Sequence, residues 1–213
     1  MPFAVFRSAS SPYSAAVGFT RSQLEACVDG TLPDLLSDDV RLLFVGINPG
    51  LWTVATQSHF SRRGNRFYPA LFRAGITDRL IDASDGYRPE DREHLLDRGI
   101  GNTNIVARAT ARADELSTDE LQAGSRALTE LVERVAPKVV AVLGITAYRV
   151  AFGRRKAGAG QQRETLAGVP LWVAPNPSGL NAHSSVDDLA EAYREIAVAA
   201  GIPVHPRPRP VPR

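Results

Sequence analysis

Continuous runs of apolar residues mark the strands that the chain is expected to form. RLLFVG (41–46) and KVVAVLG (138–144) are apolar at consecutive positions, which is typical of strands buried on both faces. IGNTNIV (100–106) is a third strand candidate. PLWVAPNPSGL (170–180) reads as a strand that runs into a turn of Asn, Pro and Gly.

Segments with apolar residues at helical spacing lie between these runs. The clearest begins at Ser117, where Glu120 completes a capping-box pattern before a helical stripe of leucines. The segments expected to be helical are 65–75, 89–99, 117–137, 145–153 and 185–201. Strands that alternate with helices predict an α/β fold, in which a parallel sheet is covered on both faces. Ligands of such sheets bind at the carboxyl ends of the strands.

Composition narrows the class of protein only slightly. The chain has 213 residues, 44% of them apolar and 23% charged, as in an ordinary globular protein with one sizeable core. A net charge of +2 permits nucleic-acid binding without arguing for it. The single cysteine, Cys27, excludes an internal disulfide and an all-cysteine metal site. The four histidines are scattered without zinc spacing, so no metal and no cofactor are expected.

The ends of the chain differ from its middle. Residues 1–30 are expected to form a partly flexible N-terminal arm, and 31–201 a single catalytic domain. Residues 202–213 alternate Pro with Arg, which predicts a basic, disordered tail. No secretory signal and no apolar run long enough to span a membrane is visible, so a cytoplasmic location, nucleoid-associated in a bacterium, is expected.

Two turns rich in Gly, Pro and Asn follow predicted strands, and they mark the expected site. GINPG (46–50) resembles a phosphate-binding turn, but it lacks the Gly-Lys-Ser/Thr of a phosphate loop, which argues against a nucleotide hydrolase. NPSGL (176–180) follows the last predicted strand. On its own, Asn48 in the first turn is most simply a residue that tolerates an unusual backbone conformation.

Taken together, five motifs resemble the mismatch-specific uracil-DNA glycosylase family, which includes the thymine-DNA glycosylases. They are TLPDLL (31–36), GINPGL (46–51), GNRFY (64–68), GIGNTNIVARAT (99–110) and NPSGL (176–180). The resemblance extends from Leu32 to Gly201. It implies a three-layer α/β/α sandwich around a mainly parallel sheet of four to five strands. It also implies an enzyme that extrudes uracil, or a related damaged pyrimidine, paired with guanine and hydrolyses its bond to the sugar.

The resemblance assigns roles in a base pocket. Asn48 is expected to aim a water at C1′ of the sugar, since a bond that breaks with cationic character needs positioning more than a strong base. Phe60 is expected to stack on the extruded base, whereas the neighbouring His59 has no expected role in the chemistry. The remaining pocket residues are Gly46, Ile47, Thr53, Asn104 and Thr110. Without the other motifs, each would be a turn, core or strand-end residue.

The second turn is expected to act as a wedge that replaces the extruded nucleotide. Leu180 would enter the base stack, Gly179 would let the backbone approach the minor groove, and backbone groups would pair with the widowed guanine. The residues assigned to this loop are Asn176, Pro177, Ser178, Gly179, Leu180 and Asn181. The chain continues with Asn-Ala-His where bacterial members often have Ser-Arg, so the residue that braces the wedge is left open.

Basic residues near the pocket aromatic are expected to contact DNA phosphates. These are Arg62, Arg63 and Arg66, with a second cluster at 154–156, although such charges are often only a solvated surface. The expected partner is double-stranded DNA with G:U or related mismatches, bound by a monomer. Enzymes that process abasic sites would act downstream. The competing hypothesis is a damaged-DNA or nucleotide-binding module without turnover.

Overall fold

The computed structural model describes residues 18–179 and 184–206, and its centre is a five-stranded sheet in the order β2-β1-β3-β5-β4. The strands are β1 (Leu42–Gly46), β2 (Ile100–Asn104), β3 (Val139–Leu143), β4 (Gly160–Leu166) and β5 (Val169–Ala174). The first three and β5 are parallel, and β4 pairs antiparallel with β5. The predicted mainly parallel sheet is therefore confirmed.

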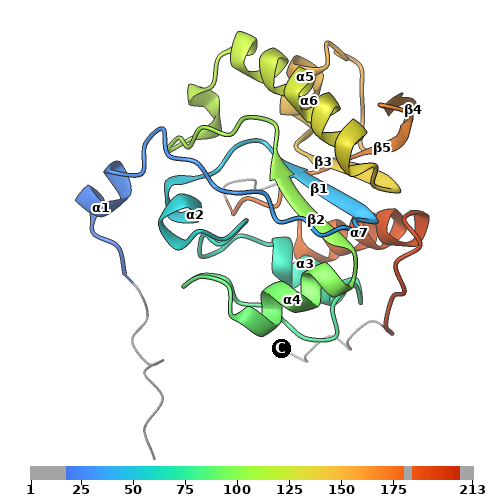
Figure 1. Cartoon of the computed structure of the whole chain (residues 1–213), viewed down its shortest axis with the longest axis horizontal. Helices are drawn as coiled ribbons and strands as arrows, with labels where there is room; N and C mark the ends of the chain where they lie inside the picture. Colours follow the sequence, from blue (N-terminus) through green and yellow to red (C-terminus); the bar gives the residue numbers. More distant parts are fainter. Residues whose placement is uncertain (1–17, 180–183, 207–213) are drawn as a thin grey trace, which may run out of the picture.

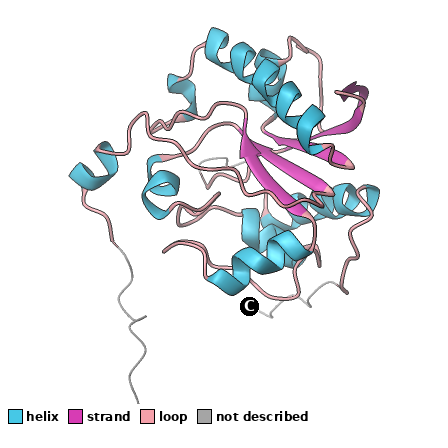
Figure 2. Ribbon diagram, in the orientation of Figure 1, coloured by secondary structure: helices cyan, strands magenta, loops and turns pink. Residues whose placement is uncertain are grey.

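Helices cover the sheet on both faces (Figures 1 and 2). On one face lie α3 (Phe67–Arg73), α4 (Pro89–Asp97) and α7 (Val186–Ala199), and on the other lie α5 (Thr118–Val135) and α6 (Ile145–Ala151). Each layer has its own apolar core, because successive strand residues point to opposite faces. The three-layer α/β/α architecture is thus confirmed.

Strand β1 shows how consecutive apolar residues divide between the two cores. Leu42 and Phe44 belong to the cluster formed with α3, α4 and α7. Leu43 and Val45 belong to the cluster formed with α5 and α6. All four side chains are 0% exposed. A strand in this position is apolar throughout because water touches neither face.

The predicted helices form within a few residues of their expected bounds, and capping explains where two of them begin. Ser117 and Glu120 make the predicted capping box of α5, and Ser185 and Asp188 make an equivalent one for α7. Among the described residues, no helix is long and apolar enough to span a membrane.

Several elements were not predicted from the pattern. They are α1 (Arg21–Glu25), α2 (Leu51–Thr56), the short 3-10 helix Ala113–Glu115 and β4. α1 lies in the segment assigned to the N-terminal arm, and it begins with a capping box of its own at Thr20. The boundaries given for the arm, the domain and the tail stay predictions. Residues 1–17 and 207–213 lie outside the described part of the chain.

The two edge strands of the sheet are β4 and β2, and their surroundings differ. β4 carries mostly polar side chains, and its register with β5 shifts between Gln161 and Thr165. At the other edge, Leu35 pairs with Asn102 of β2, with N–H···O distances of 2.9 Å in both directions. The segment before β1 therefore takes the place of a further strand beside β2.

Candidate active site

A cavity of about 390 Å³ opens at the carboxyl edge of the sheet, where the parallel strands end. Predicted site residues from four separate parts of the chain line it. They are Gly46, Ile47, Asn48, Thr53, Phe60, Arg62, Asn104, Thr110, Asn176 and Ser178. The turns after β1 and β5 thus contribute to one pocket, as expected for strands whose carboxyl ends share an edge.

The turn after β1 is held by the segment that follows β2. Its carbonyl oxygens accept backbone hydrogen bonds at Gly46 from Ile105 (2.9 Å), at Ile47 from Val106 (3.0 Å) and at Pro49 from Thr110 (3.2 Å). The donors Ile105, Val106 and Thr110 belong to the segment that follows the last residue of β2. The turn is therefore fixed through the carbonyls of Gly46, Ile47 and Pro49.

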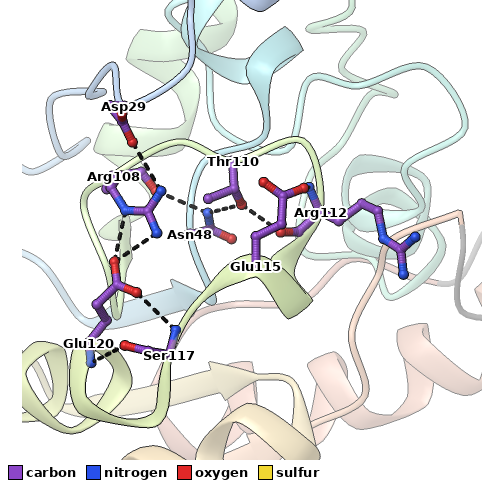
Figure 3. A network of polar contacts seen from close by, with 8 residues as sticks. All are labelled: Asp29, Asn48, Arg108, Thr110, Arg112, Glu115, Ser117 and Glu120. Carbon is purple, nitrogen blue, oxygen red and sulfur yellow. Dashed lines mark hydrogen bonds and ion pairs between the residues drawn. The ribbon is translucent and has the colours of Figure 1, made fainter.

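The hydrogen bonds of Asn48 fix the orientation of its amide (Figure 3). Nδ2 donates to the Arg108 carbonyl at 3.0 Å and to Thr110 Oγ1 at 2.7 Å. A carbonyl can only accept, and the Thr110 hydroxyl donates its own proton to the Arg112 carbonyl at 2.7 Å. Both neighbours therefore require the nitrogen of the amide, and Oδ1 points away from them as an acceptor.

The main chain at Arg108 is in turn anchored by its side chain. The guanidinium contacts Asp29 Oδ1 at 3.0 Å and Glu120 Oε1 at 2.8 Å. Glu120 also accepts from the Ser117 backbone N–H at 2.9 Å, and this bond, followed by that from Arg108, lowers the pKa of its carboxyl. The first turn of α5 and the amide of Asn48 thus belong to one connected network (Figure 3).

Gly46 lies close to the Asn104 side chain, which would have to shift to admit a Cβ at this position. A Cβ at this position would lie 2.4 Å from Asn104 Oδ1 and 3.4 Å from Phe60 Cε1. The Phe60 ring stacks on Phe67, with ring centroids 4.0 Å apart and planes inclined by 25°. Phe60 therefore has a supported aromatic face on the core side while it also lines the pocket.

His59 lines the same cavity but is committed to the scaffold. It is buried, and its Nε2 lies 3.1 Å from the Pro33 carbonyl, which requires the proton on this nitrogen. Burial lowers its pKa from 6.5 to about 4. The imidazole is therefore neutral near pH 7, and the expectation that His59 has no role in the chemistry stays a prediction.

The described part of the second turn packs against the loop that carries Phe60. The Arg66 backbone N–H donates to the Pro177 carbonyl at 2.9 Å, and Ser178 N donates to Asn176 Oδ1 at 2.9 Å. A Cβ on Gly179 would lie 2.7 Å from the Gly64 carbonyl oxygen, so glycine is needed for backbone contact. The predicted wedge residues Leu180 and Asn181 lie outside the described residues.

The three arginines predicted to contact phosphates have different surroundings. Arg62 is exposed and lines the pocket. Arg63 pairs with Asp85 at 3.4 Å, and its guanidinium carbon lies 5.9 Å from the centre of the Trp52 ring. Arg66 donates to main-chain carbonyls of the second turn, with Nη2 2.7 Å from Ser178 O. Arg62 is thus the one of these three whose described surroundings are those of the pocket itself.

Some pocket residues were missed by sequence reasoning. They are Pro49, Gly50, Asn65, Ala111, Arg112, Ala113, Asp114 and Leu143. Most directly follow or lie within the quoted motifs, and adjacency was the signal that could have found them. Arg112 and Asp114 form an ion pair, which raises the pKa of the arginine. Among the described residues, no group of three or more His, Cys, Asp or Glu side chains could hold a metal ion.

Fold and pocket together define the class of protein. The family model of the Uracil DNA glycosylase superfamily matches residues 33–197, which contain every described pocket residue. The chain belongs to this superfamily. Its membership supports a hydrolytic DNA glycosylase that acts on DNA.

A solved structure agrees with the fold. It is the solution NMR structure of "a putative Uracil DNA glycosylase" from Methanosarcina acetivorans, with 17% sequence identity and a TM-score of 0.56. The match covers 79% of this chain and 98% of that chain. At this identity, the likeness concerns the arrangement of helices and strands.

Proposed function

We propose that this protein removes uracil mispaired with guanine from duplex DNA and leaves an abasic site. Thymine or ethenocytosine opposite guanine would be further substrates, attacked at the same bond. Superfamily membership supports excision from DNA in general. The preference for a mismatch is inferred from the resemblance of the two turns to those of the mismatch-specific glycosylases.

The orientation of the Asn48 amide carries the proposal. Its two N–H bonds are used by Arg108 O and Thr110 Oγ1, so Oδ1 is the atom available at the pocket. This oxygen can accept a hydrogen bond from water at neutral pH, and it stays uncharged in doing so. An acceptor fixed in this way orients the bound water, so that a lone pair of the water can point toward C1′ of the sugar.

The reaction follows from the residues around the pocket. After extrusion, the pyrimidine stacks against Phe60, and the bond to C1′ lengthens with positive charge on the sugar. Water held by Asn48 adds to C1′, the bonding pair leaves with the base, and the water's second proton passes to solvent. Backbone N–H groups of the turn at Ile47 stabilise the negative charge on the departing base.

The direct test is excision from defined duplexes. Oligonucleotides with G:U, A:U, G:T or G:ethenocytosine are incubated with the protein and then treated with hot alkali, which breaks the strand at abasic sites. We expect cleavage at G:U to exceed that at A:U, because the second turn contacts the widowed guanine. No cleavage of any duplex would reject the enzyme, and binding without cleavage would favour the non-catalytic module.

Variants then test the role of Asn48. Asn48→Ala should lower the single-turnover rate about 100-fold or more with little change in DNA affinity. Thr110→Val removes one acceptor that orients the amide, and we expect an intermediate loss, about tenfold. Gln122→Ala, an exposed change on α5, serves as the control. Unchanged turnover in Asn48→Ala would remove this residue from the mechanism.

A further inference from the structure

We propose that Arg66 is a positioning residue that holds the second turn, the predicted wedge, against the loop that carries Phe60. This inference rests on the proposed function, since a wedge is needed only by an enzyme that extrudes a nucleotide. From the sequence, Arg66 is expected to contact phosphate, and the residue that braces the wedge is left open. The contacts of its side chain and main chain point to the brace.

Arg66 donates to three carbonyls of one distant segment. Its backbone N–H lies 2.9 Å from Pro177 O, and its Nη2 lies 2.7 Å from Ser178 O. Its Nη1 donates to Ser184 O. Ser178 is 112 residues away along the chain, so this is a long-range attachment and no consequence of local structure.

The two guanidinium contacts lie on either side of residues 180–183. Ser178 precedes this segment and Ser184, which is buried, follows it. One planar group with donors on both Nη atoms therefore ties the main chain at Ser178 and the main chain at Ser184 to the same side chain. A lysine has a single ammonium on a flexible stem and is less suited to hold two carbonyls in one geometry.

Backbone packing adds to this attachment at the same place. Gly179 and Gly64 approach so closely that a Cβ on Gly179 would lie 2.7 Å from Gly64 O. Gly64 and Arg66 lie in the loop between α2 and α3, and so does Phe60, which lines the pocket. The wedge turn and the base-stacking ring are therefore parts of one packed unit.

Such a unit has a direct consequence for extrusion. Inserting a side chain into the base stack unstacks it, and the gain in contacts must offset that cost. A turn that is already held in place loses less conformational freedom on insertion, which favours the extruded state. Loss of Arg66 should therefore weaken extrusion while it leaves the chemical step on an extruded base unchanged.

The experiment measures extrusion and excision separately. A G:U duplex with 2-aminopurine next to the uracil reports extrusion by fluorescence, and single-turnover cleavage reports excision. For Arg66→Ala we expect both to fall by the same factor, about tenfold or more, since two bonds to a charged donor are lost. Arg66→Lys should lie between this variant and the wild type. Unchanged extrusion, or excision that falls much further than extrusion, would overturn the proposal.

Two controls keep the outcome unambiguous. Arg126→Ala removes an exposed arginine of α5, and it should leave extrusion unchanged. Hydrogen exchange of peptides covering 176–186 should accelerate in Arg66→Ala at equal melting temperature, and unchanged exchange would reject the brace. If the wild type neither extrudes nor cleaves, the proposed function fails, and hydrogen exchange still decides whether Arg66 holds the turn.

Discussion

Residues of the pocket differ in how much of their hydrogen-bonding capacity is left for a ligand. Asn48 uses its nitrogen for the protein and presents its oxygen. His59 uses Nε2 for Pro33 O and is held neutral by burial. Burial therefore makes His59 an uncharged part of the wall, while partial exposure leaves Asn48 able to bind water. Residue type alone would have suggested the opposite assignment, since histidine is the commoner acid or base.

The buried imidazole also predicts a pH dependence of stability. Its pKa is about 4 in the folded protein against 6.5 for the free side chain, so the unfolded chain binds the proton more readily. The neutral, buried imidazole therefore contributes to the free energy of unfolding. This contribution is complete above pH 6.5 and is lost as the pH falls toward 4. Between pH 7 and pH 5 we expect a loss of about 2 kcal/mol that His59→Gln does not show.

Urea denaturation at the two pH values measures this difference. Burial also lowers the pKa of His94, so the wild type alone would not isolate the effect, whereas the comparison with the variant does. Glutamine keeps a donor in reach of Pro33 O and cannot be protonated. An equal loss of stability in both proteins would contradict the prediction.

Helix α5 contacts residues that hold the site at two positions along its length. Its capping box includes Glu120, whose carboxylate also holds Arg108 and through it the amide of Asn48. One turn further along, Gly124 lies against Ile105, the residue whose N–H holds the carbonyl of Gly46. The helix therefore contacts the residues that hold both sides of the turn after β1, although none of its own residues lines the pocket.

This contact predicts an unusual response to Gly124→Ala. Alanine in a helix interior ordinarily stabilises by about 1 kcal/mol relative to glycine. Here the new Cβ would lie 2.2 Å from Ile105 O, which is backbone. We expect a net destabilisation of about 1–3 kcal/mol, as for overpacked cores, measured by urea denaturation. Gln122→Ala, on the exposed side of the helix, should be nearly neutral, and a stabilised Gly124→Ala would show that the segment yields.

At the scale of the whole molecule, the sheet places the ligand site at the carboxyl ends of its parallel strands. All parallel strands end there, and the turns after β1 and β5 meet across the cavity. The net charge of +2 is too small to attract DNA strongly over a distance. Affinity should therefore depend on a few cations near this edge, while cations at the opposite edge should contribute little.

Salt dependence of binding tests this view. The affinity for a duplex with an abasic site, measured by fluorescence anisotropy at several salt concentrations, should fall linearly on a log–log plot. Arg62→Ala should reduce the slope by about 1. Lys138→Ala removes the same charge just before β3, at the amino edge, and should leave the slope unchanged. Equal slopes in all three proteins would exclude a phosphate contact by Arg62.

Sequence patterns were most informative where one physical requirement dominates. The runs at 41–46 and 138–144 could be read as strands because burial on both faces excludes polar residues. β4 could not, since an edge strand of Gln, Arg and Glu has no such constraint. α2 is six residues long, and its N-cap is Gly50, which has no side chain to cap the helix.

The candidate site also has features that the sequence predicts and features that it does not. That the turn after β1 and the turn after β5 share an edge follows from the topology alone. The orientation of the Asn48 amide depends on partners 60 and 62 residues away, and the contacts of Arg66 on a partner 112 residues away. Such pairs depend on the relative positions of loops in the folded chain, which spacing along one sequence does not encode.

The edge strands of the sheet affect how readily the protein can associate with itself. An exposed strand edge is a template for a strand of another molecule, and so a starting point for aggregates. β4 presents exposed Arg163 and Glu164 beside an irregular register, and the backbone around Leu35 already occupies the neighbouring position on β2. Addition of a foreign strand is therefore disfavoured at both borders.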